Sequence, residues 1–255
     1  MQIRVLGAHN IESATSRMMC LLVDGVLAVD AGSLASGLAL SEQEKVRSIL
    51  VTHRHYDHVK DVAAMAINFS FAERNIRVYG EADTLKVVSE HLLDGVLYPD
   101  FSRLPAANPA LTYCPLEALK EVEVDGYRVL PVPTNHVSTV GYQVTSQDGR
   151  SFFYTGDTGP GLQACWERIS PELLFIDVTL PDRMEKHAVA TKHLCPRLFG
   201  EELALFRKVR GYLPRVVPIH MSPPLEDEIR GEVERVAREV GADIEFAQEG
   251  TTLSL

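Results

Sequence analysis

The chain has 255 residues, of which 45% are hydrophobic and 24% charged, as is typical of a folded globular protein with a sizeable core. Its formal net charge of −10 at pH 7 argues against non-specific binding to nucleic acid, which needs a basic surface. No apolar run is long enough to span a membrane, and we expect no membrane association.

The first part of the sequence alternates predicted strands with predicted helices. Short apolar runs predict strands at residues 3–6, 19–23, 26–29, 48–52 and 77–79. Apolar residues at helical spacing predict helices over residues 61–72 and 82–93.

Residues 94–118 interrupt this alternation. Prolines stand at 99, 105, 109 and 115, and the aromatic residues follow no clear period. Linkers rarely contain aromatic residues in this way, so we predict an ordered excursion over the surface, with a lid or a dimer contact as its two candidate roles.

The second part of the chain is again rich in strands. Strands are predicted at residues 122–124, 127–132, 141–145, 151–154, 173–177, 215–219 and 244–247, and helices at residues 201–210 and 226–240. Because the composition does not change along the chain, we predict a single α/β domain over residues 1–255, with sheets covered by helices.

Residues 51–60, VTHRHYDHVK, gather ligand-type side chains directly after the apolar strand 48–52. They contain His53, His55, Asp57 and His58. Imidazole and carboxylate groups suit zinc, iron or manganese, and alternate residues of an extended segment point to one side. An isolated histidine is usually structural, but three within six residues, with an aspartate, indicate a metal site.

Three later strand ends each supply one more candidate ligand. His136 follows the strand 127–132, Asp157 follows the strand 151–154, and His220 follows the strand 215–219. Together with the first cluster they are sufficient for two metal sites that share the carboxylate of Asp157.

The motif HRHYDH resembles the H-x-H-x-D-H signature of the metallo-β-lactamase fold superfamily, and His136, Asp157 and His220 match its remaining ligands in order. The resemblance implies a four-layer αββα sandwich with two divalent ions, zinc in the first instance, with manganese or iron as alternatives. It implies that His53, His55 and His136 bind one ion, that Asp57, His58 and His220 bind the other, and that Asp157 bridges them. It also implies hydrolysis by a hydroxide that bridges the ions.

The stretch TKHLCP, residues 191–196, resembles the histidine-leucine element of the phosphodiesterase branch, which holds tRNase Z and bacterial class II-like cyclic-nucleotide phosphodiesterases. Lys192 stands where glycine is common in that branch. His193 is the candidate general acid, because the unperturbed pKa of histidine lies near neutrality. Asp57 is the second candidate catalytic residue, and His193, Lys192 and His9 are candidate substrate contacts, the last two on weaker grounds.

These observations favour a dinuclear metal-dependent phosphodiesterase that acts on a small nucleotide, with a 3′,5′-cyclic nucleotide as the expected substrate. The alternatives are a tRNase Z-like nuclease, which the acidic charge disfavours, a lactone or thioester hydrolase on the same metals, and a non-catalytic metal-binding protein. We expect a homodimer as one possible assembly.

The N-terminus lacks the pattern of a signal peptide, and the four cysteines form no CxxC pair. We therefore expect reduced thiols and a cytoplasmic location.

Overall fold

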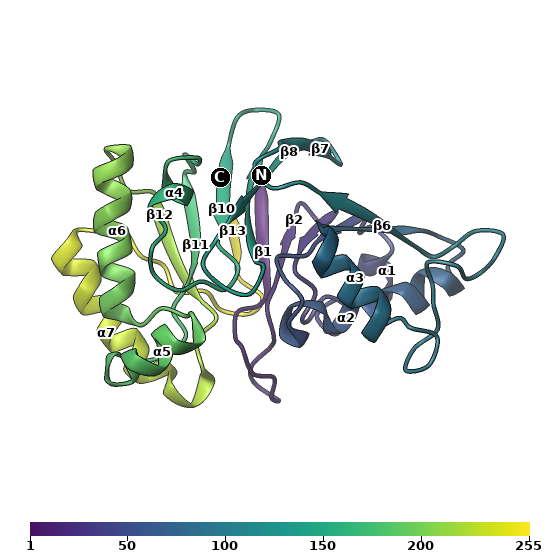
Figure 1. Ribbon diagram of the computed structural model, residues 1–255, viewed down its shortest axis with the longest axis horizontal. Coiled ribbons are helices and arrows are strands. Elements are labelled where there is room, and N and C mark those ends of the chain that lie inside the picture. Colours follow the sequence, from purple (N-terminus) through teal and green to yellow (C-terminus); the bar gives the residue numbers. More distant parts are fainter. The chain divides into compact units, whose positions relative to one another are not determined.

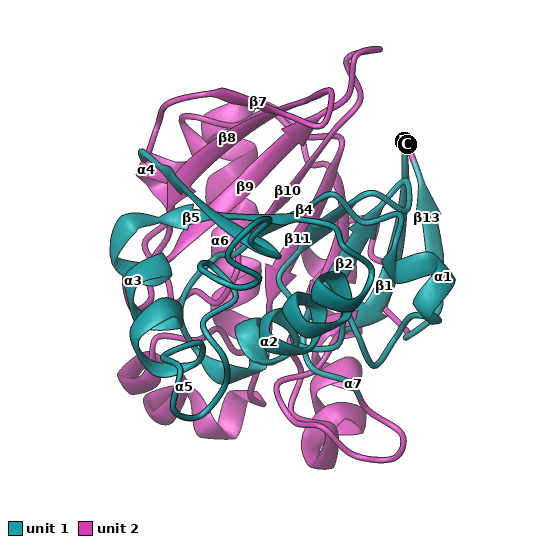
Figure 2. Cartoon of the chain, turned by 90° about the vertical axis from the view of Figure 1, so that its right-hand side faces the viewer, with its two compact units in different colours: residues 1–7, 17–117, 249–254 teal, residues 8–16, 118–248, 255 magenta.

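Two β-sheets organise the chain, one in each of the two units into which its residues cluster. The structure is a computed structural model that describes residues 1–255. Unit 1 comprises residues 1–7, 17–117 and 249–254, and unit 2 comprises residues 8–16, 118–248 and 255 (Figure 2).

The sheet of unit 1 has seven strands in the order β13-β1-β2-β3-β4-β5-β6. Neighbouring strands from β3 to β6 pair in parallel, whereas β13, β1, β2 and β3 pair antiparallel. Parallel neighbours need crossover connections, which α2 and α3 supply, and these helices flank the sheet (Figure 1). The elements are β1 Gln2–Gly7, β2 Cys20–Val23, β3 Leu27–Val29, α1 Leu40–Gln43, β4 Ser48–Leu50, α2 Tyr56–Phe71, β5 Ile76–Glu81, α3 Ala82–His91, β6 Leu111–Leu116 and β13 Thr252–Ser254.

The sheet of unit 2 has six strands in the order β12-β11-β10-β9-β8-β7. Strands β10, β11 and β12 pair in parallel and the others antiparallel, and α6 and α7 flank this sheet (Figure 1). The elements are β7 Val122–Val124, β8 Tyr127–Pro133, β9 Val140–Thr145, β10 Ser151–Tyr154, α4 Gln163–Trp166, β11 Leu173–Asp177, α5 Glu185–Thr191, α6 Pro196–Arg210, β12 Arg215–Ile219 and α7 Glu226–Val240, with short 3₁₀ turns at Asp182–Met184 and Pro223–Leu225.

Each unit has its own hydrophobic core. In unit 1, α2 buries Val62, Met65, Ala66 and Phe69, whose helical spacing forms one apolar face. In unit 2, Trp166 packs edge-on against Phe206 with ring centroids 5.3 Å apart. These faces hold the helices against the sheets and so fix the strand ends that carry the candidate ligands.

The predicted α/β architecture of two sheets flanked by helices is confirmed, but three element predictions are corrected. Helix α2 begins at Tyr56 rather than at residue 61, so the end of the histidine cluster lies inside its first turn. Residues 244–247 form only an isolated bridge, between Val216 and Ile244, and the closing strand is β13. Helix α6 begins at Pro196, because proline fits the first turn of a helix, where its missing N–H is not needed.

Residues 94–110 contain no helix or strand, and residues 111–116 form β6 at the edge of the first sheet. The excursion is therefore shorter than predicted. Its role as a lid or dimer contact stays a prediction, as does the single domain over residues 1–255.

None of the helices is both long and apolar enough to cross a membrane. The four cysteines are free thiols, and Cys20, Cys165 and Cys195 are buried. Burial raises the pKa of the Cys195 thiol to about 11.

Candidate metal centre

The first set of candidate ligands lies where β4 passes into α2. His53 and His58 are buried, and their ring centroids are 4.2 Å apart. His55 is the N-cap residue of α2, and its ring centroid lies 4.6 Å from that of His53. Asp57 places Oδ2 3.4 Å from Nε2 of His58. One short segment thus gathers three imidazoles and a carboxylate.

Asp30, which directly follows β3, orients two of these histidines and is absent from the sequence prediction. Its buried carboxylate accepts hydrogen bonds from Nδ1 of His58 at 2.7 Å and from the Thr52 hydroxyl at 2.9 Å. Because that hydroxyl donates to Asp30, it accepts the hydrogen bond from Nδ1 of His53 at 3.1 Å. Both rings therefore carry their proton on Nδ1, which makes Nε2 the ligand atom.

Replacing Asp30 with asparagine is expected to weaken metal binding by about 10- to 100-fold, because an amide has one acceptor oxygen, whereas Asp30 accepts from Thr52 with Oδ1 and from His58 with Oδ2. The measurement is a competition titration with a chromophoric chelator. Asp83→Asn on α3, an exposed carboxylate of the same unit, is the matched control. Unchanged affinity in Asp30→Asn would contradict this role.

The second set of candidate ligands lies at three strand ends of unit 2. His136 follows β8, Asp157 follows β10, and His220 follows β12. Asp157 places Oδ2 3.9 Å from Nε2 of His136 and Oδ1 3.3 Å from Nε2 of His220. A carboxylate with one oxygen toward each of two imidazoles is suited to bridge two ions.

Backbone and hydroxyl groups orient these rings in the same way as in unit 1. Nδ1 of His136 lies 3.0 Å from the carbonyl oxygen of Lys192, to which it donates. Nδ1 of His220 lies 2.8 Å from Oγ1 of Thr179, whose hydroxyl donates to Asp177 at 2.6 Å. Both rings therefore present Nε2 toward Asp157.

His193 lies among these ligands and is held by Asp177 at the end of β11. Nδ1 of His193 donates to Oδ2 of Asp177 at 2.7 Å, and the side chain of Asp177 is fully buried. The ring centroid of His193 is 4.9 Å from that of His136 and 5.3 Å from that of His220. This pair is a histidine oriented by a carboxylate, an arrangement suited to proton transfer. The sequence signal for Asp177 was only its place at the end of a buried strand.

Lys192 contributes its backbone to this arrangement. It ends α5 in the left-handed conformation, with φ of 57°. Glycine adopts this conformation most readily, which explains why glycine is common at this position in the phosphodiesterase branch. A Cβ on Gly159 would lie 3.1 Å from Cα of Lys192, so the glycine permits the close approach of the two segments. The carbonyl contact with His136 is therefore the structural role of Lys192, and its exposed side chain stays a predicted substrate contact.

His9 belongs to none of the ligand groups, although its backbone pairs with Met221, the residue after His220. It is 5% exposed, and its Nε2 lies 3.1 Å from Oε2 of Glu226 on α7. Its role as a substrate contact stays a prediction.

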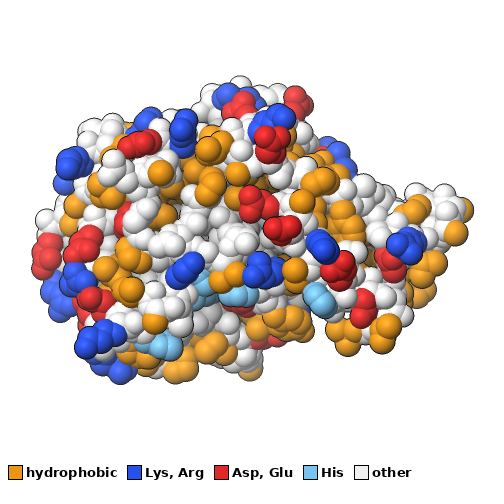
Figure 3. Space-filling view, viewed as in Figure 1, with side chains coloured by type: hydrophobic (Ala, Val, Ile, Leu, Met, Phe, Trp, Pro, Cys, Tyr) orange, Lys and Arg blue, Asp and Glu red, His pale blue; other side chains and the backbone are white.

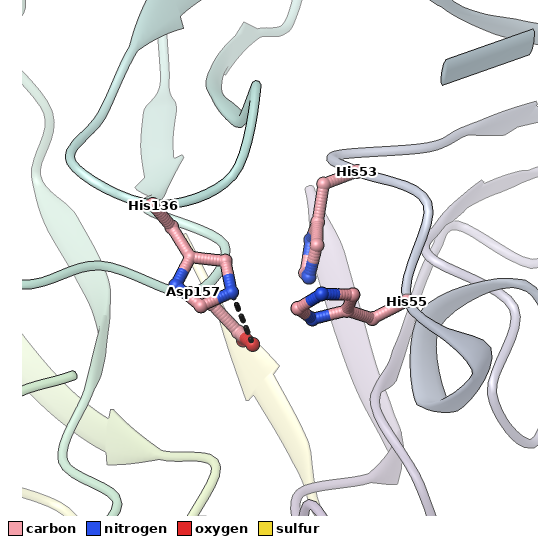
Figure 4. A group of neighbouring side chains, drawn as sticks. All are labelled: His53, His55, His136 and Asp157. Atoms are coloured by element: carbon pink, nitrogen blue, oxygen red, sulfur yellow. Dashed lines mark ion pairs between the residues drawn. The ribbon is translucent and has the colours of Figure 1, made fainter. Parts of the chain in front are cut away.

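The predicted ligands fall into groups whose ligand atoms lie within 4.8 Å of one another. One contains His53, His55, His136 and Asp157 (Figure 4), and another contains Asp57, His58, Asp157 and His220. A third contains Asp177, His193 and His220. Histidine side chains reach the surface on the face shown in Figure 3. The imidazole and carboxylate donors, and the Nδ1 bonds that direct Nε2 inward, fit divalent metal ions.

Comparison with known proteins places this geometry in a family. Residues 21–221 match the family model described as the β-lactamase superfamily domain. The Anti-Pycsar protein Apyc1 of Paenibacillus harenae is 31% identical over 141 residues, which are 54% of this chain and 56% of that protein. The chain thus matches about half the length of this curated relative.

Solved structures with the same fold cover nearly the whole chain. Unliganded yeast PDE1 superposes with a TM-score of 0.82 at 16% identity, over 100% of this chain and 99% of that one. YhfI from Bacillus subtilis, a metallo-β-lactamase fold protein, superposes with a TM-score of 0.77 at 16% identity, over 99% of this chain and 98% of that one. The short form of human tRNase Z superposes with a TM-score of 0.68 at 18% identity, over 100% of this chain and 99% of that one.

At these identities the solved structures show the fold alone, and the predicted fold type is confirmed. The family match covers most of the chain, including the positions of all seven predicted ligands. The chain therefore belongs to the β-lactamase superfamily, a family of metallo-β-lactamase fold hydrolases whose site implies divalent metal ions.

Proposed function

We propose that this protein is a metal-dependent phosphodiesterase that hydrolyses a small nucleotide, with a 3′,5′-cyclic nucleotide as its substrate. The observation that carries the proposal is the pair of Asp177 and His193, with Nδ1 2.7 Å from the carboxylate, beside the ligand histidines. Cleavage of an alkyl phosphodiester expels an alkoxide, a poor leaving group that needs a proton, and a histidine oriented by a carboxylate is suited to supply it.

Two divalent ions would be held by the two groups that share Asp157, zinc in the first instance, with manganese or iron as alternatives. Such ions, when bound, neutralise phosphoryl oxygens and lower the pKa of water. The chain itself orients the ligand imidazoles through Asp30, Thr52 and Thr179.

His193 would move the proton in this reaction. Its Nδ1 proton is committed to Asp177, so Nε2 is the atom that would protonate the leaving oxygen. The side chain is 14% exposed, which leaves it accessible to a substrate, whereas the carboxylate that orients it is fully buried.

A small nucleotide is favoured over tRNA because the chain has 35 acidic and 25 basic residues, and RNA binding requires a basic surface. The resemblance of TKHLCP to the phosphodiesterase branch supports a phosphodiester over a lactone or thioester. A non-catalytic role is disfavoured because every ligand position of the family motif is filled.

A substrate panel with Mn²⁺ or Zn²⁺ tests the proposal. We expect hydrolysis of bis(p-nitrophenyl) phosphate and of cyclic mononucleotides, with much slower cleavage of precursor tRNA, a homoserine lactone and a thioester. Metal content is measured on the same samples. A protein that holds two ions per chain and cleaves the lactone but no phosphodiester would refute the proposal.

A further inference from the structure

Two residues alternate with the ligands in the segment from His53 to His58, and both reach the surface. Arg54 is half-buried, and Tyr56 is 61% exposed at the start of α2. Packing in the core does not explain a tyrosine at this position, because its side chain is exposed. Most large aromatic side chains of this chain are buried instead. The exposed ones are Tyr56, Phe71 and Tyr212, and among them only Tyr56 adjoins ligand residues.

Neither side chain is engaged within the protein. The side chain of Tyr56 makes no hydrogen bond or ring contact, and that of Arg54 makes no ion pair, although the chain carries an excess of acidic residues. The backbone at both positions is nevertheless fixed, because His53 and His58 on either side are buried and held through Thr52 and Asp30. A cation and an aromatic ring are thus presented to solvent on a rigid segment beside the candidate ligands.

We propose that Arg54 and Tyr56 determine specificity for a nucleotide: the guanidinium of Arg54 contacts the phosphate, and the ring of Tyr56 stacks on the base. This inference rests on the proposed phosphodiesterase function and extends it to recognition of the base. A guanidinium matches the geometry of phosphate oxygens, and an aromatic face stacks on any base without selecting among them. The substrate class is therefore a nucleoside cyclic phosphate with little discrimination among bases.

The test compares a substrate that has a base with one that lacks it. We expect Tyr56→Ser to raise KM for 3′,5′-cyclic AMP by about tenfold or more, the loss of one stacked base. KM for methyl ribofuranoside 3′,5′-cyclic phosphate, which has no base, should stay within about twofold of the wild-type value. Tyr56→Phe should retain the wild-type KM for both, because the ring and not the hydroxyl stacks. Arg54→Gln should raise KM for both substrates.

Matched controls exist in the same unit. Phe71, at the other end of α2, is 85% exposed, and Phe71→Ser should leave both KM values unchanged. Arg47, which precedes β4, is also exposed, and Arg47→Gln serves as the control for Arg54→Gln. Metal content is measured for every variant.

The outcomes separate this inference from the proposed function. If Tyr56→Ser keeps its metals and shows the wild-type KM for 3′,5′-cyclic AMP, the stacking role is wrong while the phosphodiesterase function stands. An equal rise for the substrate with and without a base would also refute stacking. If the wild-type protein cleaves no phosphodiester when fully loaded with metal, the proposed function itself fails.

Discussion

Replacing Asp157 with alanine is expected to remove at least one of the two metal ions and to lower kcat/KM on bis(p-nitrophenyl) phosphate by about 10³-fold or more. The reason is geometric. The two oxygens of Asp157 lie toward different imidazoles, with Oδ1 3.3 Å from Nε2 of His220 and Oδ2 3.9 Å from Nε2 of His136. Removal of the carboxylate therefore takes one ligand from both groups at once. The measurements are elemental analysis of the purified variant and its rate of hydrolysis.

The control for this variant is Asp227→Ala, an exposed carboxylate on α7 in the same unit. It should retain the metal content and activity of the wild-type protein. If Asp157→Ala retained two ions per chain and near wild-type turnover, the shared role of Asp157 would be wrong.

Replacing His193 with alanine is expected to lower kcat on a cyclic nucleotide by about 10²- to 10⁴-fold, the usual contribution of a general acid. Both metal ions should remain, because the first two ligand groups do not include His193. The loss should be smaller for bis(p-nitrophenyl) phosphate, since p-nitrophenolate is a good leaving group that departs without a proton. Asp177→Asn should show the same dependence on the leaving group, because its carboxylate holds Nδ1 of His193.

The comparison of leaving groups distinguishes this role from a merely structural one. A damaged site would lower the rates on both substrates equally. If His193→Ala instead loses a metal ion, His193 is a ligand and its assignment as general acid is wrong. Elemental analysis of the same sample decides between these outcomes.

The seven candidate ligands could be identified from the sequence because each lies a few residues after an apolar strand, and Asp57 and His58 continue the cluster that begins at His53. The start of α2 at Tyr56 could not, because residues 56–60 carry ligands instead of the periodic apolar residues that identify a helix. The helix forms there because its later turns pack Val62, Met65 and Phe69 into the core of unit 1.

The residues that orient the ligands were harder to predict. Asp30 contacts a histidine 28 positions later, and the carbonyl oxygen of Lys192 accepts a hydrogen bond from a ring 56 positions earlier. No local pattern encodes such pairs, since a lone aspartate after a strand resembles any turn residue. The left-handed conformation of Lys192 is likewise set by the chain around it.

The terminal strand illustrates the same limit. Residues 244–247 have the more apolar pattern, whereas β13 consists of Thr252, Leu253 and Ser254, of which only Leu253 is buried. The strand forms because β1 offers a free edge with which these residues pair antiparallel. Partner availability, rather than local propensity, decided this element.

Hydrolysis of 3′,5′-cyclic AMP by wild-type protein loaded stepwise with Mn²⁺ or Zn²⁺ tests whether this chain is a dinuclear phosphodiesterase. Metal content is determined on each sample. We predict that formation of the nucleoside monophosphate rises with metal content and levels off at two ions per chain. A protein that holds two ions per chain and leaves cyclic nucleotides intact would contradict the proposed function.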